Sequence, residues 1–259
     1  MDRQRSELDE RFTGESLDLD VWVPYYLPHW SSRAESGATW AIRDGQLRLS
    51  IPADQPLWCP DTHAEPLRVS CIQSGCFSGP VGSTVGPQPF RDGLTVREAQ
   101  PTHWGYTPLY GRIEVGMRAR IGPQSMFAFW LSGIEDQPER SGEICVAEIF
   151  GDTMRDGAAD IGMGVHRLRD PKLVEDFSTV RRHFDPSEFH VYAVDWARSS
   201  VTLSMDGERL RHIDQAPDYP MQLMLGVFDF PDKPRPRPDG IEPELMISHV
   251  TGVPFDPAG

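Results

Sequence analysis

Alternation of apolar and polar positions runs through most of the chain and predicts strands rather than helices. In residues 110–120, apolar Ile113, Val115, Met117 and Ala119 alternate with charged side chains. This period of two is typical of an antiparallel strand with one buried face. Similar patterns predict strands at residues 39–42, 46–51, 126–131, 143–150, 161–166, 189–196, 201–205, 222–228 and 245–250. Without a long amphipathic helix, the prediction is an all-β fold of two curved antiparallel sheets packed face to face.

Two segments interrupt this pattern. Residues 57–100 are rich in Pro, Gly and Ser, and residues 229–243 are rich in Pro and charged side chains. We expect long loops there, the first of them at the edge of a cleft. Neither segment resembles a linker between two cores, so residues 1–259 are expected to form a single domain.

The charge balance restricts the classes of molecule that the protein is expected to bind. The 39 acidic and 25 basic residues give a net charge of −14. Such a chain is a poor partner for nucleic acid or for an anionic membrane. A neutral polysaccharide or oligosaccharide is compatible with it, and we expect a monomer.

The chain start and the cysteines bear on location. Residues 1–7 are charged and no apolar h-region follows, and no apolar run has transmembrane length. The expectation is a cytoplasmic protein, or an exported one whose leader has been removed. Cys71 and Cys76 could form a disulfide or be free thiols. No cysteine or histidine pair has the spacing of a structural zinc site.

Two glutamates stand out in residues 141–151, because Glu143 and Glu148 interrupt an apolar run. In a regular strand, side chains five positions apart point to opposite faces. A β-bulge between them would bring both carboxyls to one face, where a separation of about 5 to 5.5 Å suits retaining glycoside hydrolysis. The alternative is that both are solvated charges at the rim of a sheet.

Further motifs occur in a fixed order along the chain. They lie at Phe12, Gly14, Leu17, Asp18, Trp22, Tyr110–Glu114, Met126–Trp130, Phe189–His190, Tyr192, Trp196 and Met205–Gly207. In this order they resemble glycoside hydrolase family 16, the laminarinase-like β-glucanases. The resemblance implies a concanavalin-like β-jelly roll with a substrate cleft on its concave face.

The resemblance also implies an activity. Residues 143–148 look like the Glu-x-Asp-x-x-Glu signature of the family. Glu143 would then be the nucleophile and Glu148 the general acid/base of a retaining, endo-acting hydrolase. Its substrate would be a β-linked polysaccharide, with a β-1,3-glucan as the expected one, and no cofactor is implied.

One departure concerns catalysis directly, because Cys145 stands where the family has its middle Asp. We therefore expect slow turnover or an altered pH optimum. One alternative is a non-catalytic, lectin-like carbohydrate-binding protein. Another is a thiol nucleophile at Cys145 with His166 as its base. Ser248 stands where many members have a calcium-binding Asp, so we expect no bound metal.

Candidate substrate-binding residues are two tryptophans and a histidine. Sugar rings have apolar faces that stack on flat aromatic side chains. Trp130 is a candidate platform, with a core position as its alternative, and Trp104 is a candidate at the rim. His166 could hydrogen-bond substrate or orient Glu148, although a structural role is equally open. Met126, where the family has a Trp, predicts a changed subsite.

Overall fold

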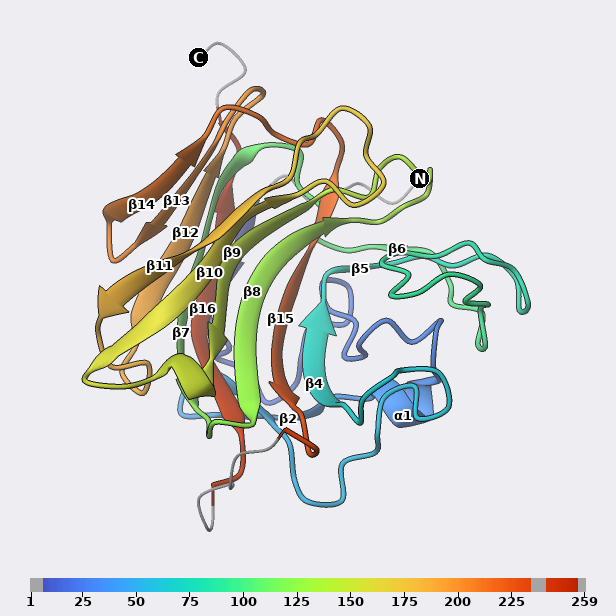
Figure 1. The fold of residues 1–259 in the computed structure, drawn as a ribbon, viewed down its shortest axis with the longest axis horizontal. Helices are drawn as coiled ribbons and strands as arrows, with labels where there is room; N and C mark the ends of the chain where they lie inside the picture. The colour runs from blue at the N-terminus through green and yellow to red at the C-terminus, as the bar shows by residue number, and fades with distance from the viewer. Residues whose placement is uncertain (1–6, 234–240, 256–259) are drawn as a thin grey trace.

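Two large antiparallel sheets make up almost the whole protein (Figure 1). The computed structural model describes residues 7–233 and 241–255. Within them, helical structure is confined to α1 (Arg33–Ser36) and the 3₁₀-helix η1 (Gly151–Thr153). The predicted all-β sandwich is therefore confirmed. Of the second predicted loop, residues 234–240 lie outside the described part of the chain.

The first sheet has eight strands in the order β14-β13-β12-β7-β16-β3-β2, with β1 also paired to β16. The second has six strands in the order β11-β10-β9-β8-β15-β4. Neighbouring strands are often distant in sequence, since the chain crosses repeatedly between the sheets, as in a jelly roll.

The first sheet consists of β1 (Leu8–Glu10), β2 (Thr39–Arg43), β3 (Gln46–Ser50), β7 (Gly111–Arg120), β12 (His190–Trp196), β13 (Val201–Met205), β14 (Glu208–Ile213) and β16 (Glu244–Val253). The second consists of β4 (Arg68–Gln73), β8 (Ser125–Gly133), β9 (Glu143–Phe150), β10 (Ala158–His166), β11 (Asp176–His183) and β15 (Met221–Asp229). A separate two-stranded ladder joins β5 (Gly75–Cys76) and β6 (His103–Trp104).

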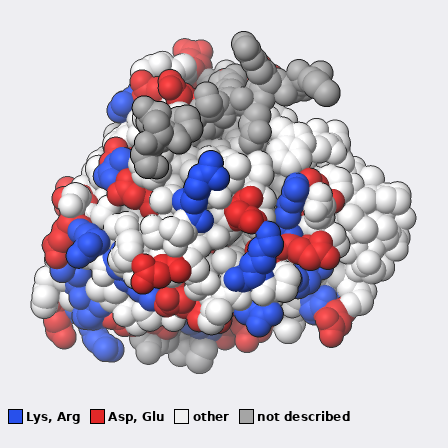
Figure 2. Space-filling view, turned by 90° about the horizontal axis from the view of Figure 1, so that it is seen from above, with Lys and Arg blue, Asp and Glu red and all other residues white. Residues whose placement is uncertain are grey.

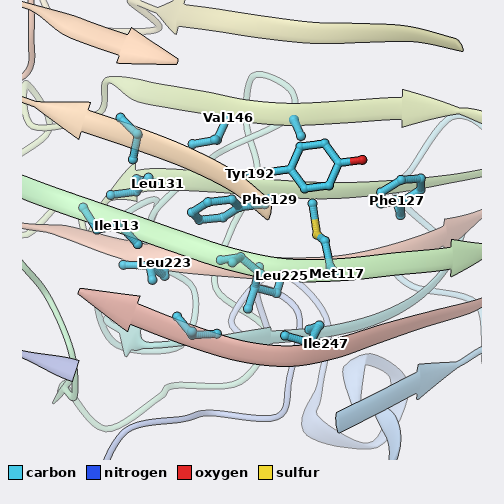
Figure 3. Close-up of a cluster of buried hydrophobic side chains, with 14 of the residues drawn as sticks. Ile113, Met117, Phe127, Phe129, Leu131, Val146, Tyr192, Leu223, Leu225 and Ile247 are labelled. Carbon is cyan, nitrogen blue, oxygen red and sulfur yellow. The ribbon is translucent and has the colours of Figure 1, made fainter. Parts of the chain in front are cut away.

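The main hydrophobic core lies between the two large sheets (Figure 3). Strand β7 contributes Ile113 and Met117 from one sheet, and β8 contributes Phe127 and Phe129 from the other. All four side chains are fully buried. Burial of each such side chain contributes roughly 1.5–3 kcal/mol. Packing between the layers therefore fixes which face of each strand points inward.

A second cluster, here called the outer cluster, covers part of the opposite face of the six-stranded sheet. It joins residues of β4, β8 and β15 to side chains of the 57–100 segment, including Trp58, Leu94 and Val96. This explains why every residue of β8 and β15 is buried and their apolar pattern is nearly continuous. The predicted loop segment thus packs onto the sheet.

Several strands were missing from the sequence prediction. Strand β4 lies inside the segment predicted to be loop, so that expectation was wrong for residues 68–73. Strands β11 and β14 lie at the sheet edges and are largely exposed and charged, which removes the apolar alternation. Strand β1 spans three residues, and β5 and β6 span two each, too few to show a period.

The surface mixes charges of both signs. On the face shown in Figure 2, basic and acidic side chains are interspersed. Ion pairs also link charged side chains within a strand and on neighbouring strands: Arg112 pairs with Asp195 at 2.7 Å and with Glu114 at 2.7 Å. That face therefore offers no continuous basic surface to nucleic acid. Within the described residues, no helix is long and apolar enough to cross a bilayer. All four cysteines are free thiols and buried.

Candidate active site

A β-bulge in β9 determines which side chains face the cleft. Across β8 and β9, Trp130 pairs with Cys145 and Phe129 with Ala147, so Val146 has no partner. The register between β9 and β10 shifts at the same place. Val146 points into the main core (Figure 3), and Ala147 belongs to the same buried cluster. The extra inward residue returns the alternation to the outer face at Glu148.

Both glutamates consequently line one cavity on the outer face of the six-stranded sheet. The cavity measures about 400 Å³ and is lined by Glu143, Cys145 and Glu148 from β9. Pockets of this size accommodate small organic ligands and short stretches of polymer. The remaining lining residues are Tyr26, Leu27, Trp58, His63, Leu67, Gln88, Pro89, Phe90, Met126, Ala128, Trp130, Glu135, Leu168, Arg169 and Phe228.

Burial shifts both carboxyls toward their protonated forms, and the charge of Glu148 adds to the shift at Glu143. Burial raises the pKa of Glu143 to about 7, an effect opposed by His166, reinforced by Glu148 and opposed again by a hydrogen bond from Gln88. Burial likewise raises the pKa of Glu148, with His166 opposing. The pair therefore retains a proton at a higher pH than two exposed glutamates would.

Cys145 lies between the glutamates on the same face. Its Sγ donates to the Gly162 carbonyl at 3.6 Å. Burial, followed by the charges of Glu143 and Glu148, raises the pKa of the thiol well above its ordinary value. A neutral thiol is a weak nucleophile. This environment lends no support to Cys145 as the attacking group.

His166 lies directly opposite Glu143 in the β9–β10 pairing. Its Nδ1 contacts Glu175 Oε1 at 2.5 Å, and its ring stacks on Phe177 with centroids 4.4 Å apart. His166 is not among the residues that line the cavity. It acts on the glutamates through its charge, as the shifts of their pKa values indicate.

The two candidate tryptophans differ in position. Trp130 lines the cavity and is almost fully buried there, 6% exposed, against Phe228. Trp104 belongs to the short β5–β6 ladder and is absent from the cavity lining. The structure therefore brings Trp130 to the glutamates and leaves Trp104 apart from them.

Three polar residues at the cavity were not identified from the sequence. Gln88 Nε2 donates to Glu143 Oε2 at 2.7 Å, and the Gln88 backbone N–H donates to Glu135 Oε1 at 2.6 Å. Arg169 forms an ion pair with Glu135. All three lie between strands, where no periodic pattern marks a functional position.

Aromatic side chains that were also missed form one wall. Trp58 contacts Tyr26 and Phe90, each with ring centroids 4.9 Å apart, and His63 at 5.6 Å. The prediction that residues 57–100 border a cleft agrees with this wall. Its individual members could not be found from the sequence, because their partners are distant in the chain.

Ser248 is the residue that the sequence analysis considered in relation to metal binding. Its Oγ donates to the Gly116 carbonyl at 3.1 Å. Within the described residues, no group of three or more His, Cys, Asp or Glu side chains is arranged to hold a metal. The expectation of no tightly bound calcium stays a prediction.

Comparison with known proteins places the chain in a family. The sequence model of glycosyl hydrolases family 16 matches residues 105–235. Congo red hypersensitive protein 1 of Saccharomyces cerevisiae is 26% identical over 125 residues, which are 46% of this chain and 23% of that protein. This chain therefore spans about a quarter of that curated relative's length.

Solved structures show the same fold. The GlcNAcα1-4Gal-releasing endo-β-galactosidase from Clostridium perfringens has a TM-score of 0.81 and 24% identity, covering 96% of this chain and 63% of that one. The laminarinase catalytic domain from Thermotoga petrophila RKU-1 has a TM-score of 0.64 and 14% identity, covering 96% and 97%. Because the family model matches just over half of this chain, the chain belongs to glycosyl hydrolase family 16.

Proposed function

We propose that this protein is a retaining, endo-acting glycoside hydrolase that cleaves a β-linked polysaccharide, with a β-1,3-glucan as its expected substrate. The observation that carries the proposal is the bulge at Val146, which places Glu143 and Glu148 on one face. Both line the same aromatic-walled cavity. Two carboxyls flanking a common site are the minimal machinery for double displacement.

In the first step, the ionised Glu143 carboxylate attacks the anomeric carbon and the glycosidic bond breaks. Glu148 donates its proton to the departing glycosidic oxygen, so the leaving chain departs as an alcohol. The sugar is then held as an ester on Glu143. In the second step Glu148 takes a proton from water, and the resulting hydroxyl displaces Glu143 with net retention.

The pKa shifts support the role of Glu148 and constrain the role of Glu143. Glu148 must hold a proton, and burial raises its pKa as that role requires. Glu143 must be ionised to attack, yet burial raises its pKa to about 7. The charge of His166 and the Gln88 hydrogen bond both favour ionised Glu143.

The walls of the cavity support a sugar substrate. Trp130, Trp58 and Phe90 line it with aromatic surface, while Glu135 and Arg169 supply polar groups. Aromatic platforms beside a few polar groups suit pyranose rings. The choice of β-1,3-glucan rests on the likeness to laminarinases, and galactans are retained as competing substrates because one similar structure is that of an endo-β-galactosidase.

The test is release of reducing ends from laminarin, lichenan, galactans and carrageenans, with Glu148→Gln as the control variant. We expect cleavage of laminarin by the wild type and none by the variant. Identification of the products as β-anomers at early times, by proton NMR, would establish retention.

A non-catalytic, carbohydrate-binding protein is the second candidate. Cys145 favours it, because a neutral, buried thiol between the glutamates supplies no acidic group. Binding of several of these glycans without cleavage of any would favour this candidate over the hydrolase.

A further inference from the structure

Glu143 needs a hydrogen-bond donor to stay ionised in its cavity. Burial and the nearby Glu148 both disfavour its charge. Cys145 gives no bond to it, since that thiol donates to the Gly162 carbonyl. A carboxylate buried without a donor is costly, so a donor beside Glu143 fixes its orientation and, together with the larger effect of the charge of His166, favours its ionised form.

Gln88 supplies that donor from outside the sheet. Its Nε2 lies 2.7 Å from Glu143 Oε2, within the range of a strong, charge-assisted hydrogen bond. Oε2 is engaged by the amide, and among the described residues no hydrogen bond to Oε1 is found, so Oε1 is the oxygen available for attack. A primary amide does not titrate near neutral pH, so it donates across the whole working range.

The backbone of Gln88 is held in place on its other side. Gln88 has a left-handed φ of 52°, which costs a non-glycine residue about 1 kcal/mol. Its N–H donates to Glu135 Oε1 at 2.6 Å. The Glu135 side chain is 1% exposed and is neutralised by Arg169. Arg169, Glu135 and Gln88 therefore form a continuous polar chain that ends on Glu143.

This chain joins three parts of the fold. Gln88 belongs to the 57–100 segment, Glu135 follows β8, and Arg169 lies between β10 and β11. Three loops are thus linked in series, and the first of them contacts one oxygen of a sheet residue through Gln88. A hydrogen bond maintained by this much surrounding structure, against backbone strain, is a candidate functional contact.

We propose that Gln88 is the positioning residue of Glu143, holding one carboxylate oxygen so that the other faces the substrate, and that Glu135 and Arg169 hold Gln88 for this task. The role of Glu143 as nucleophile rests on the proposed function. The contact itself does not, and the two can be tested separately.

The experiment compares wild type with Gln88→Leu and Gln88→Asn. Asn keeps the amide and tolerates the left-handed backbone, but it is one methylene too short to keep the bond. Gln137→Leu, at an exposed position after β8, is the matched control. Circular dichroism and melting temperature verify that each variant folds.

The direct readout is titration of Glu143 by carbon NMR in protein labelled at the glutamate carboxyl, with Glu143→Gln identifying its signal. Loss of a bond to a charged group should raise the pKa of Glu143 by about one to two units. Gln137→Leu should leave the pKa of Glu143 unchanged. The second readout is the pH dependence of laminarin hydrolysis, where both Gln88 variants should lose about 10- to 100-fold in kcat with little change in KM.

A conservative variant sharpens the test. In Gln88→Glu a protonated carboxyl can donate to Glu143 at acidic pH, while an ionised one repels it. Its activity should therefore approach wild type at acidic pH and fall steeply as pH rises, a profile that a merely structural defect would not produce.

Each outcome decides something. An unchanged Glu143 titration in folded Gln88→Leu and Gln88→Asn overturns the positioning role, whatever the activity. A raised pKa in a protein that cleaves no glycan upholds the Gln88 contact and refutes the hydrolase. A raised pKa together with lower kcat supports both.

Discussion

Gly162 lies directly opposite Glu148 across the β9–β10 pair, and a Cβ at this position would press against the far end of the Phe177 ring. A Cβ at Gly162 would lie 2.7 Å from Phe177 Cζ and 3.4 Å from Glu148 Cβ. The same residue accepts the Cys145 thiol at its carbonyl. Gly162 therefore lies close to the proposed acid/base Glu148, to Cys145 and to the Phe177 ring.

From this contact we predict that Gly162→Ala lowers activity more than stability. The Phe177 ring must shift, at a cost of about 1 kcal/mol, and Glu148, whose backbone oxygen would lie 3.3 Å from the added Cβ, must move by a few tenths of an ångström. Laminarin hydrolysis and thermal melting measure the two effects. Gly157→Ala is no suitable control because of its left-handed backbone, whereas Gly14→Ala introduces a Cβ with no contact closer than 3.8 Å. Wild-type activity in Gly162→Ala would show that the close contact is irrelevant to Glu148.

The two glutamates should respond differently to an external nucleophile. In Glu143→Ala, azide can replace the missing carboxylate and attack the substrate from the same side, which yields an inverted glycosyl azide. In Glu148→Ala, azide instead attacks the glycosyl-enzyme and yields a product of retained configuration. Each variant should lose about 10²- to 10⁴-fold on an unactivated substrate before rescue.

Proton NMR of the azide products from an activated aryl β-glycoside is the measurement. Exchange of the two outcomes would reverse the assigned roles. The test discriminates between the two assignments where the pKa does not, since burial raises the pKa of Glu143 to about 7.

The bulge predicts how two changes at Val146, its replacement and its deletion, affect activity and stability. Val146→Ala removes buried methyl groups from the core but keeps the extra residue, so it should cost about 1–2 kcal/mol and preserve activity. Deletion of Val146 restores strict alternation between Glu143 and Glu148. The two glutamates would then lie four positions apart in a regular strand and would still share the outer face, so a folded deletion variant should keep measurable activity, with a loss of stability from the one-residue shift in β9.

Chemical denaturation measures the stability of both Val146 variants, and hydrolysis assays measure their activity. A folded deletion variant that cleaves nothing would contradict the idea that a shared outer face is sufficient for the two carboxyls to act together.

Sequence alternation was sufficient to predict most of the sandwich, and it indicated the bulge because Glu143 and Glu148 would otherwise point apart. It failed for charged edge strands such as β14, where exposure removes the pattern. It also failed for Gln88, Glu135 and Arg169. Their contacts join residues 34 to 55 positions apart in sequence, and nothing local marks these loop residues as partners.

Cys145 makes a prediction about pH. Replacement by Asp adds an acidic group beside Glu143 that can share its proton, whereas the thiol of the wild type stays neutral because burial raises its pKa. We expect Cys145→Asp to change the pH–rate profile and to increase turnover. Cys145→Ser, which adds no titratable group, is the matched control. An identical profile in all three proteins would remove Cys145 from any account of catalysis.

Glu143 should make the protein less stable as pH rises. Its folded pKa is raised from 4.5 to about 7, chiefly by burial, so the folded state binds a proton that the unfolded state has released between these values. Stability contributed by this proton is complete below pH 4.5 and is lost as pH rises toward 7. Glu143→Gln removes the ionisable group and should therefore stabilise the protein by about 2–3 kcal/mol at pH 8, with little effect at pH 4.5.

Denaturant unfolding of wild type and Glu143→Gln from pH 4.5 to 8 measures this difference, with Glu139→Gln at an exposed site as the control. A stability gain that grows with pH and is confined to Glu143→Gln is the expected result. It would show that the fold tolerates a destabilising carboxylate at this position, which is what a group retained for chemistry rather than for packing should do. A gain of equal size at every pH would assign the effect to packing and would argue against a strained, functional carboxylate.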